Sequence, residues 1–216
     1  AALNTLDGKT TVAIDAAAVT TLTGAAVTLN TAFDSGGISN LSDQDVTLTD
    51  SSLTASVLNA LDGNTTGSID ASSITTLTGT AAELIEAVTS DGITGLGDEA
   101  ITVDSGTATT AQANALADET SGIVTATIAE GDLATLAGLT GTGNAYSITI
   151  DDASVDAAAL NTLDAKTTVA IDAAAVTTLT GLATDLIEAV TSNGITGLGD
   201  EAITVDSGTA TTAQAN

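Results

Sequence analysis

The chain of 216 residues lacks His, Cys, Pro, Met and Trp, and it contains a single Tyr and a single Phe. Without His and Cys there is no imidazole base, no thiol nucleophile, no disulfide and none of the usual ligands of zinc, haem or iron–sulfur centres. Paired carboxylates could act on a glycoside, but sugar sites usually contain aromatic platforms that this chain cannot supply. We therefore expect no enzymatic activity and no redox cofactor.

Positive charge is almost absent as well. Lys9 and Lys166 are the only cationic side chains, against 28 acidic ones, and the formal net charge is -26. A nucleic-acid-binding protein must neutralise phosphates, and a protein bound to an anionic membrane surface needs cations. No apolar run approaches the 18 or so residues of a membrane span. We therefore expect neither nucleic acid nor a membrane as a partner.

The residues that are abundant are small and β-forming. Thr occurs 43 times and Ala 41 times. Leu, Ile, Val and Phe together make about 24% of the chain, just above the level of about 20% below which a highly charged chain is expected to be disordered. This composition favours a thin, regular core over an ordinary globule.

Long segments of the sequence recur. The segment 3–24, LNTLDGKTTVAIDAAAVTTLTG, returns at 58–79 and 160–181, and the segment 81–114 returns at 183–216 and more loosely at 25–59. Short β-rich pieces ending in an acid mark a smaller period, with spacings near 21 and 34 residues that sum to about 55. Units too small to bury their own apolar face are typical of solenoids, in which neighbours supply the core. The sequence predicts about eight such rungs.

Each rung is predicted to consist of strand, turn, helix and turn. VTLT, ITV and ITI alternate β-branched residues, as short strands do. Apolar residues at i, i+4, i+5 and i+8 indicate helices over 53–61 and 155–163, and the segments 81–88 and 183–190 are helix-like and followed by Gly92 and Gly194 as helix stops. We predict an α/β solenoid with one parallel sheet and short helices on the other wall. An all-β parallel helix is the alternative, because TTLTG and GIVTATI also suit strands.

An acid closes each β-rich piece, and two interpretations of it are open. As a cap, it would accept the first free N–H groups of a helix that follows it. As a metal ligand, it would belong to a row of carboxylates, with one acid from each rung, and this row would bind Ca²⁺. We expect no cofactor other than Ca²⁺. No D-x-D-x-D-G loop or G-G-x-G-x-D nonapeptide is present. The acids are Asp15, Asp50, Asp70, Asp104, Glu130, Asp151, Asp172 and Asp206.

Two polar residue types also recur. Asn4, Asn59, Asn114 and Asn161 occupy one position of the repeat, and we expect a structural ladder in which they satisfy turn backbone groups. Thr-x-Thr pairs resemble the ice-binding face of β-solenoid antifreeze proteins, but they fall at different phases of the rung. The pairs are 21/23, 47/49, 76/78, 107/109, 125/127, 178/180 and 209/211.

The repeated text LNTLDGKTTVAIDAAAVTTLTG and GITGLGDEAITVDS resembles the tandem segments of very large secreted surface proteins of cyanobacteria and other marine bacteria, often grouped as haemolysin-type or adhesin-like. The resemblance covers the whole chain. It implies an extracellular or cell-surface location, export without cleavage of a classical signal, room for Ca²⁺ dependence, and a role in a sheath, filament, motility or adhesion.

We therefore interpret residues 1–216 as one uncapped repeat array, an excerpt of a longer chain. The expected function is a structural segment of an extracellular filament, sheath or surface layer, and an adhesive or ice-binding module is the alternative. Asn216 occupies the repeat position of Asn4, so the two ends are in phase. We expect copies to stack head to tail, or the chain to continue beyond both ends.

Overall fold

The computed structural model describes residues 2–206, which form eight short helices and sixteen short strands. Every strand pair given below is parallel, so the prediction of an α/β architecture is confirmed and the all-β alternative is wrong. The chain divides into two compact units, which are described separately: unit 1 contains residues 1–105 and 119–122, and unit 2 contains residues 106–118 and 123–216. None of the helices in the described part is long and apolar enough to cross a bilayer.

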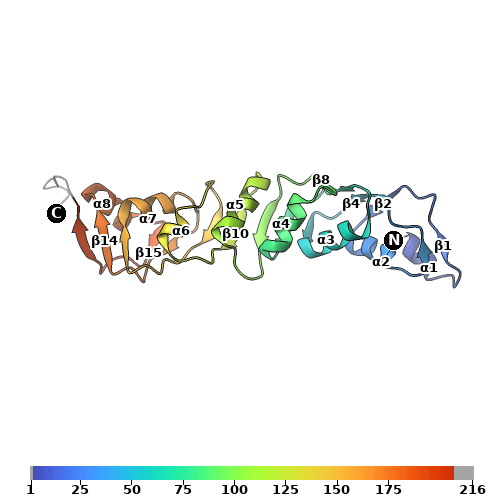
Figure 1. Cartoon of the computed structure of the whole chain (residues 1–216), viewed down its shortest axis with the longest axis horizontal. Helices are drawn as coiled ribbons and strands as arrows, with labels where there is room; N and C mark the ends of the chain where they lie inside the picture. Colours follow the sequence, from blue (N-terminus) through green and yellow to red (C-terminus); the bar gives the residue numbers. More distant parts are fainter. Residues whose placement is uncertain (1, 207–216) are drawn as a thin grey trace. The chain divides into compact units, whose positions relative to one another are not determined.

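Unit 1 alternates strands with helices that pack side by side in chain order, from α1 to α4 (Figure 1). Its parallel pairs are β1 with β3, β2 with β4, β4 with β6, β6 with β8, β5 with β7, and β7 with β9. The elements are α1 (Ala2–Asp7), β1 (Ile14–Asp15), β2 (Thr21–Gly24), α2 (Ala26–Phe33), β3 (Ile38–Ser39), β4 (Asp45–Leu48), β5 (Ser52–Thr54), α3 (Ala55–Asn64), β6 (Ile69–Asp70), β7 (Thr76–Gly79), α4 (Ala81–Thr89), β8 (Ile93–Thr94) and β9 (Ala100–Val103).

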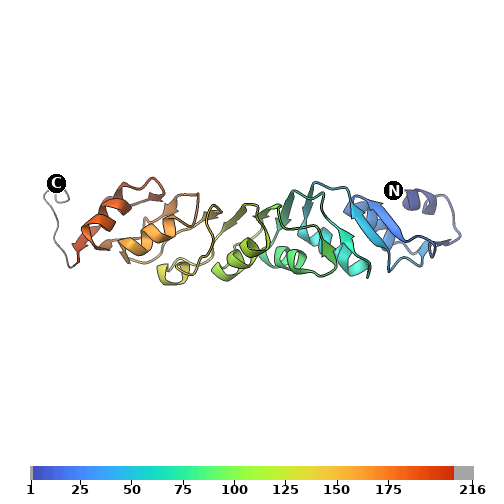
Figure 2. The same cartoon turned by 90° about the horizontal axis from the view of Figure 1, so that it is seen from above.

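Unit 2 follows the same plan, with α6, α7 and α8 packed in succession (Figure 2). Its parallel pairs are β10 with β11, β12 with β14, β13 with β15, and β14 with β16. The elements are α5 (Thr110–Glu119), whose last residue belongs to unit 1, β10 (Val124–Thr127), α6 (Leu133–Leu136), β11 (Ala145–Ser147), β12 (Ser154–Asp156), α7 (Ala157–Asp164), β13 (Ile171–Asp172), β14 (Thr178–Gly181), α8 (Ala183–Thr191), β15 (Ile195–Thr196) and β16 (Ala202–Val205).

The pairing offset differs from the spacing of the acids. Thr21 pairs with Asp45, Thr76 with Ala100, and Thr178 with Ala202, each 24 residues apart. The acids suggested 21 and 34 because they mark two different places: Asp15 ends a two-residue strand before a turn, whereas Asp50 follows a four-residue strand. Since that turn interrupts the extended chain, the strands form several short sheets and not the single sheet expected.

Small residues at the helix starts let the helices approach the strands closely. In α3, Ala55, Leu58 and Leu61 are buried, and α7 buries Ala157, Leu160 and Leu163 at the same positions. The core thus consists of Ala, Leu, Ile and Val, apart from Tyr146, which is fully buried in unit 2. A helical side-chain stripe at i, i+3 and i+6 supplies one wall and the alternating strand residues supply the other.

The helices expected over 81–88 and 183–190 are present as α4 and α8, but two details of the prediction are wrong. Leu53 and Val155 lie in strands β5 and β12, and the helices begin two residues later. Gly92 is not a helix stop, because α4 ends at Thr89. A Cβ at Gly92 would instead collide with the carboxylate of Asp62, so this position needs glycine for a close approach.

Candidate functional site

Five of the strand-end acids make side-chain hydrogen bonds at two kinds of place, and neither is the cap of a helix that follows. After Asp15, Asp70 and Asp172 the chain makes a turn and then another strand. The Oδ1 atom of each accepts the N–H two residues on, at 3.0, 3.1 and 3.1 Å. The Asn40 amide and then the Ala17 N–H keep the pKa of Asp15 below its ordinary value, and bonds from Ser72 do the same for Asp70. These acids stabilise turns.

The second kind of acid caps a helix that comes earlier in the chain. Asp50 Oδ2 accepts the N–H of Ala26, the first residue of α2, at 2.8 Å, and Glu130 Oε2 accepts the N–H of Thr110, the first residue of α5, at 2.9 Å. The backbone N–H groups of Asp104, Asp151 and Asp206 donate to carbonyls of Gly79, Gly131 and Gly181. Because the acid and the helix that it caps belong to different repeats, each of these caps joins two neighbouring repeats.

The register does not place the turn acids in a row of their own. Asp15 pairs with Ser39, Asp70 lies between Thr47 and Thr94, and Asp172 lies between Thr149 and Thr196. Among residues 2–206 no three acidic side chains gather into a group that could hold a metal ion. Coordination of Ca²⁺ by the strand-end acids stays a prediction, but the structure does not align the turn acids in the common row on which the prediction was based. The acids concerned are Asp15, Asp50, Asp70, Asp104, Asp151, Asp172 and Asp206.

The asparagines of the predicted ladder lie on helices and bind the backbone of the next repeat, not a turn of their own. Three of the acceptors lie in the next helix, and Gly138 follows the end of α6. Each Nδ2 atom donates to a carbonyl 24 residues later. The four bonds join Asn4 to Thr28 at 2.9 Å, Asn59 to Glu83 at 3.0 Å, Asn114 to Gly138 at 2.8 Å and Asn161 to Asp185 at 3.0 Å. A helical side chain that reaches across to a neighbouring helix fixes the spacing of the two helices.

A second recurring contact was not expected from the sequence. We call it the Asp–Ser–Gly clamp: Ser90 Oγ donates to Asp62 Oδ2 at 2.7 Å, and the Gly92 N–H donates to Ser90 Oγ at 3.1 Å. The same clamp joins Asp7 to Ser35 and Gly37, and Asp164 to Ser192 and Gly194. Its signal in the sequence is a Leu-Asp pair followed 28 residues later by Ser-x-Gly, which only the pairing of distant segments makes recognisable.

Threonine rows form only in part. Thr54, Thr78 and Thr102 are in register on β5, β7 and β9, but the neighbouring row reads Ser52, Thr76 and Ala100. In unit 2 the corresponding row begins with Asp156. The pair 209/211 lies outside the described residues. These rows do not make a continuous two-column Thr face.

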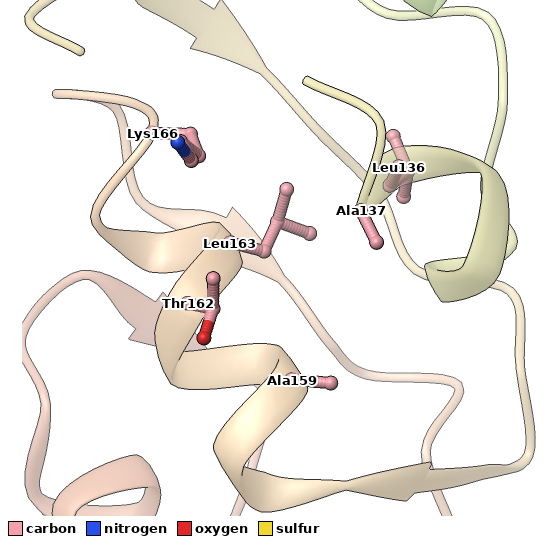
Figure 3. A pocket seen from close by; sticks show the side chains of 6 residues that line it. All are labelled: Leu136, Ala137, Ala159, Thr162, Leu163 and Lys166. Atoms are coloured by element: carbon pink, nitrogen blue, oxygen red, sulfur yellow. The ribbon is translucent and has the colours of Figure 1, made fainter. Parts of the chain in front are cut away.

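A cavity of about 260 Å³ lies between α6 and α7 (Figure 3). Leu136, Ala137, Ala159 and Leu163 give it an apolar lining, and Lys166 lies at its edge together with Thr162. The hollow forms where α6 has a single turn while α7 has two. It offers room for a small apolar group.

The caps, asparagine bonds and clamps described above thus join one repeat to the next. In comparisons with known proteins, no family model, no curated protein and no solved structure matches the chain.

Proposed function

We propose that the chain is a structural repeat segment of an extracellular filament, sheath or surface layer, in which it works as a stiff, self-associating α/β solenoid of about eight rungs, one for each helix. The observation that carries this proposal is the recurrence of one offset. Strand pairs and asparagine bonds connect residues 24 positions apart in unit 1 and again in unit 2. The offset shortens to 20 residues between β10 and β11.

The contact types support stiffness. Neighbouring repeats are joined by parallel strand pairing, at four places by an Asn of the ladder, and at three places by an Asp–Ser–Gly clamp. Buried helix and strand residues lie between these bonds. Because adjacent repeats are connected at several separate points, bending one against the next requires breaking several bonds at once.

An exposed strand supports self-association. Ile101 and Val103 on β9 are 0% and 8% exposed, whereas their counterparts on β16, Ile203 and Val205, are 49% and 50% exposed. The two strands have the same sequence, AITV, so composition does not cause this difference. Among residues 2–206 no further strand pairs with β16 beyond β14, and a strand edge beside an apolar face is a surface to which another strand adds readily. A second copy of the chain, with its own repeats in phase, suits this surface.

The extracellular location rests on the resemblance of the sequence and on the charge of -26, which suits a solvated surface array. The threonine rows do not favour the ice-binding alternative, and no contact favours an adhesive ligand over another chain.

The proposal is tested by the assembly of the chain in solution. We expect residues 1–216 to form linear assemblies in electron micrographs and a rising mass with concentration in sedimentation experiments. The double substitution Ile203→Glu and Val205→Glu should abolish assembly and leave the circular dichroism spectrum unchanged, because both side chains are already exposed. Thr204→Glu is the matched control on the opposite face of β16 and should assemble as the wild type does. A wild-type chain that stays monomeric at high concentration would overturn the proposal.

A further inference from the structure

Glu99 is a carboxylate buried without sufficient partners. Its side chain is 0% exposed, Oε2 accepts the Gly97 N–H at 2.7 Å, and Oε1 is buried with no hydrogen-bond partner. A buried charge costs several kcal/mol unless it is paired and hydrogen-bonded. The environment of Oε1 therefore needs an explanation.

The repeat provides a comparison, because Gln44 stands 55 positions earlier in the same local structure. Ser42 N–H donates to Gln44 Oε1 at 2.8 Å, as Gly97 N–H does to Glu99 Oε2. Thr65 Oγ1 donates to the Gln44 carbonyl at 2.8 Å, and Thr120 Oγ1 donates to the Glu99 carbonyl at 2.7 Å. The two side chains therefore lie in equivalent pockets, and Oε1 of Glu99 corresponds to Nε2 of Gln44.

The surroundings of Gln44 Nε2 are all acceptors. It donates to the carbonyl oxygens of Val19 and Asn40, each at 3.2 Å, and to Asp43 Oδ1 at 2.7 Å. The backbone has the same course in the second copy, since Asn40 and Gly95 both have a positive φ, of 62° and 82°.

The same 55-residue correspondence places Ile74, Gly95 and Asp98 where the first copy has Val19, Asn40 and Asp43. This correspondence brings the Glu99 carboxylate to a position that the first copy fills with an amide donor among three oxygen acceptors. Oxygen acceptors in such an arrangement repel one another unless a hydrogen-bond donor or a cation lies between them.

We propose that this pocket is a calcium site, held by Glu99 Oε1, the Asp98 carboxylate and the carbonyl oxygens of Ile74 and Gly95. Carboxylate and backbone carbonyl oxygens are the ligands Ca²⁺ prefers, and its irregular coordination tolerates completion by water on the exposed side of Asp98. Two carboxylates balance its charge in a chain that has few cations of its own. The site is distinct from the strand-end acids, and it does not depend on the structural function proposed above.

The two copies allow a reciprocal test. Equilibrium dialysis with radioactive Ca²⁺, in excess KCl to suppress diffuse binding to the negative surface, measures the bound ions per full-length chain. We expect Glu99→Gln to lose one bound ion and Gln44→Glu to gain one. Both variants should fold, because each copies a side chain that the other pocket already accommodates. Glu188→Gln removes the same charge from an exposed position on α8, outside any copy of this pocket, and should bind as the wild type does.

The readout separates a metal site from its alternatives. Thermal unfolding should show a Ca²⁺-induced rise in Tm for the wild type that Glu99→Gln lacks. Unchanged dialysis binding in Glu99→Gln would overturn the proposal. So would a wild-type chain whose Tm responds to pH through Glu99 but not to Ca²⁺, since a proton would then supply the missing donor.

Discussion

Among single residues, Tyr146 departs most from the Ala, Leu, Ile and Val composition of the core. Tyr146 is the one large aromatic group in the core of unit 2, and its hydroxyl donates to the Ala113 carbonyl at 3.3 Å. Burial, and secondly the negative charge of Asp118, raises the pKa of Tyr146 to about 12. An aromatic ring of this size buries more area than any Leu of the repeat. Unit 2 therefore has one ionisable group inside its core.

We predict an alkaline transition that depends on this tyrosine. The pKa of Tyr146 in the folded state lies above the unfolded value near 10, so its contribution to stability is complete below about pH 10 and is lost as the pH rises through about 12. Near-ultraviolet absorbance of tyrosinate follows a single site, because the chain has one Tyr. Tyr146→Phe should remove the tyrosine contribution, and titration of native Tyr146 near pH 10 would contradict the prediction.

Helices and strands are stabilised mainly by what they bind in the next repeat. Helix α4 has a complete capping box of its own, with Thr80 and Glu83, and bonds from the Thr80 N–H and side chain lower the pKa of Glu83. Helix α2 has no side-chain cap from its N-cap residue Ala25 and relies on Asp50. A short helix is marginal by itself in water, so contacts between repeats decide whether these elements form.

The asparagine between α3 and α4 gives a prediction at this scale. Asn59 Nδ2 donates to the Glu83 carbonyl and to Glu86 Oε2, at 3.0 and 3.2 Å. Asn59→Ala should lower the free energy of unfolding by about 1 kcal/mol, the net value of a lost hydrogen bond. Asn59→Asp should cost more, because a carboxylate would then face a carbonyl and a second carboxylate. Urea unfolding measures both, and an Asp variant as stable as the wild type would contradict this account.

The molecule as a whole carries far more negative than positive charge. With -26 formal charges and two lysines, repulsion opposes folding wherever acids of successive repeats approach one another. Hydrogen bonds keep the pKa values of Asp15, Asp70, Glu83 and Asp132 below normal. Because these are lowered values, the stabilisation is present above about pH 4 and is lost as the pH falls through the folded-state values. Salt is therefore expected to stabilise the fold by screening the repulsion, whereas acid removes the stabilisation that these hydrogen-bonded carboxylates contribute.

We predict that added salt stabilises the chain near neutral pH. Tm should rise between low ionic strength and about 0.15 M, where the Debye length falls to about 8 Å, and NaCl and choline chloride should be equivalent because both act by screening. Ca²⁺ at equal ionic strength should raise Tm further. Equal shifts with CaCl₂ and NaCl would leave screening as the whole effect, and a Tm independent of salt would contradict the importance of repulsion.

Local pattern determined much of this protein in advance. The repeats, the α/β character, the helices α4 and α8, and the lack of thiol and imidazole chemistry follow from residue order and composition, because helix and strand periodicities are local properties. Asn4, Asn59, Asn114 and Asn161 were also recognisable as one repeated position.

Tertiary structure alone decided which distant residues meet. The spacing of acids could not reveal an offset of 24, because Asp15 and Asp50 mark different places in the fold. The clamp of Asp62 with Ser90 and Gly92 joins residues 28 or more positions apart. Likewise, the sequence shows only that Gln44 in one repeat is replaced by Glu99 in another. The structure shows that the Gln44 amide donates to surrounding oxygen atoms and that Glu99 Oε1 has no hydrogen-bond partner. Pairing between segments depends on which surfaces can be buried together, and residue order does not specify that by itself.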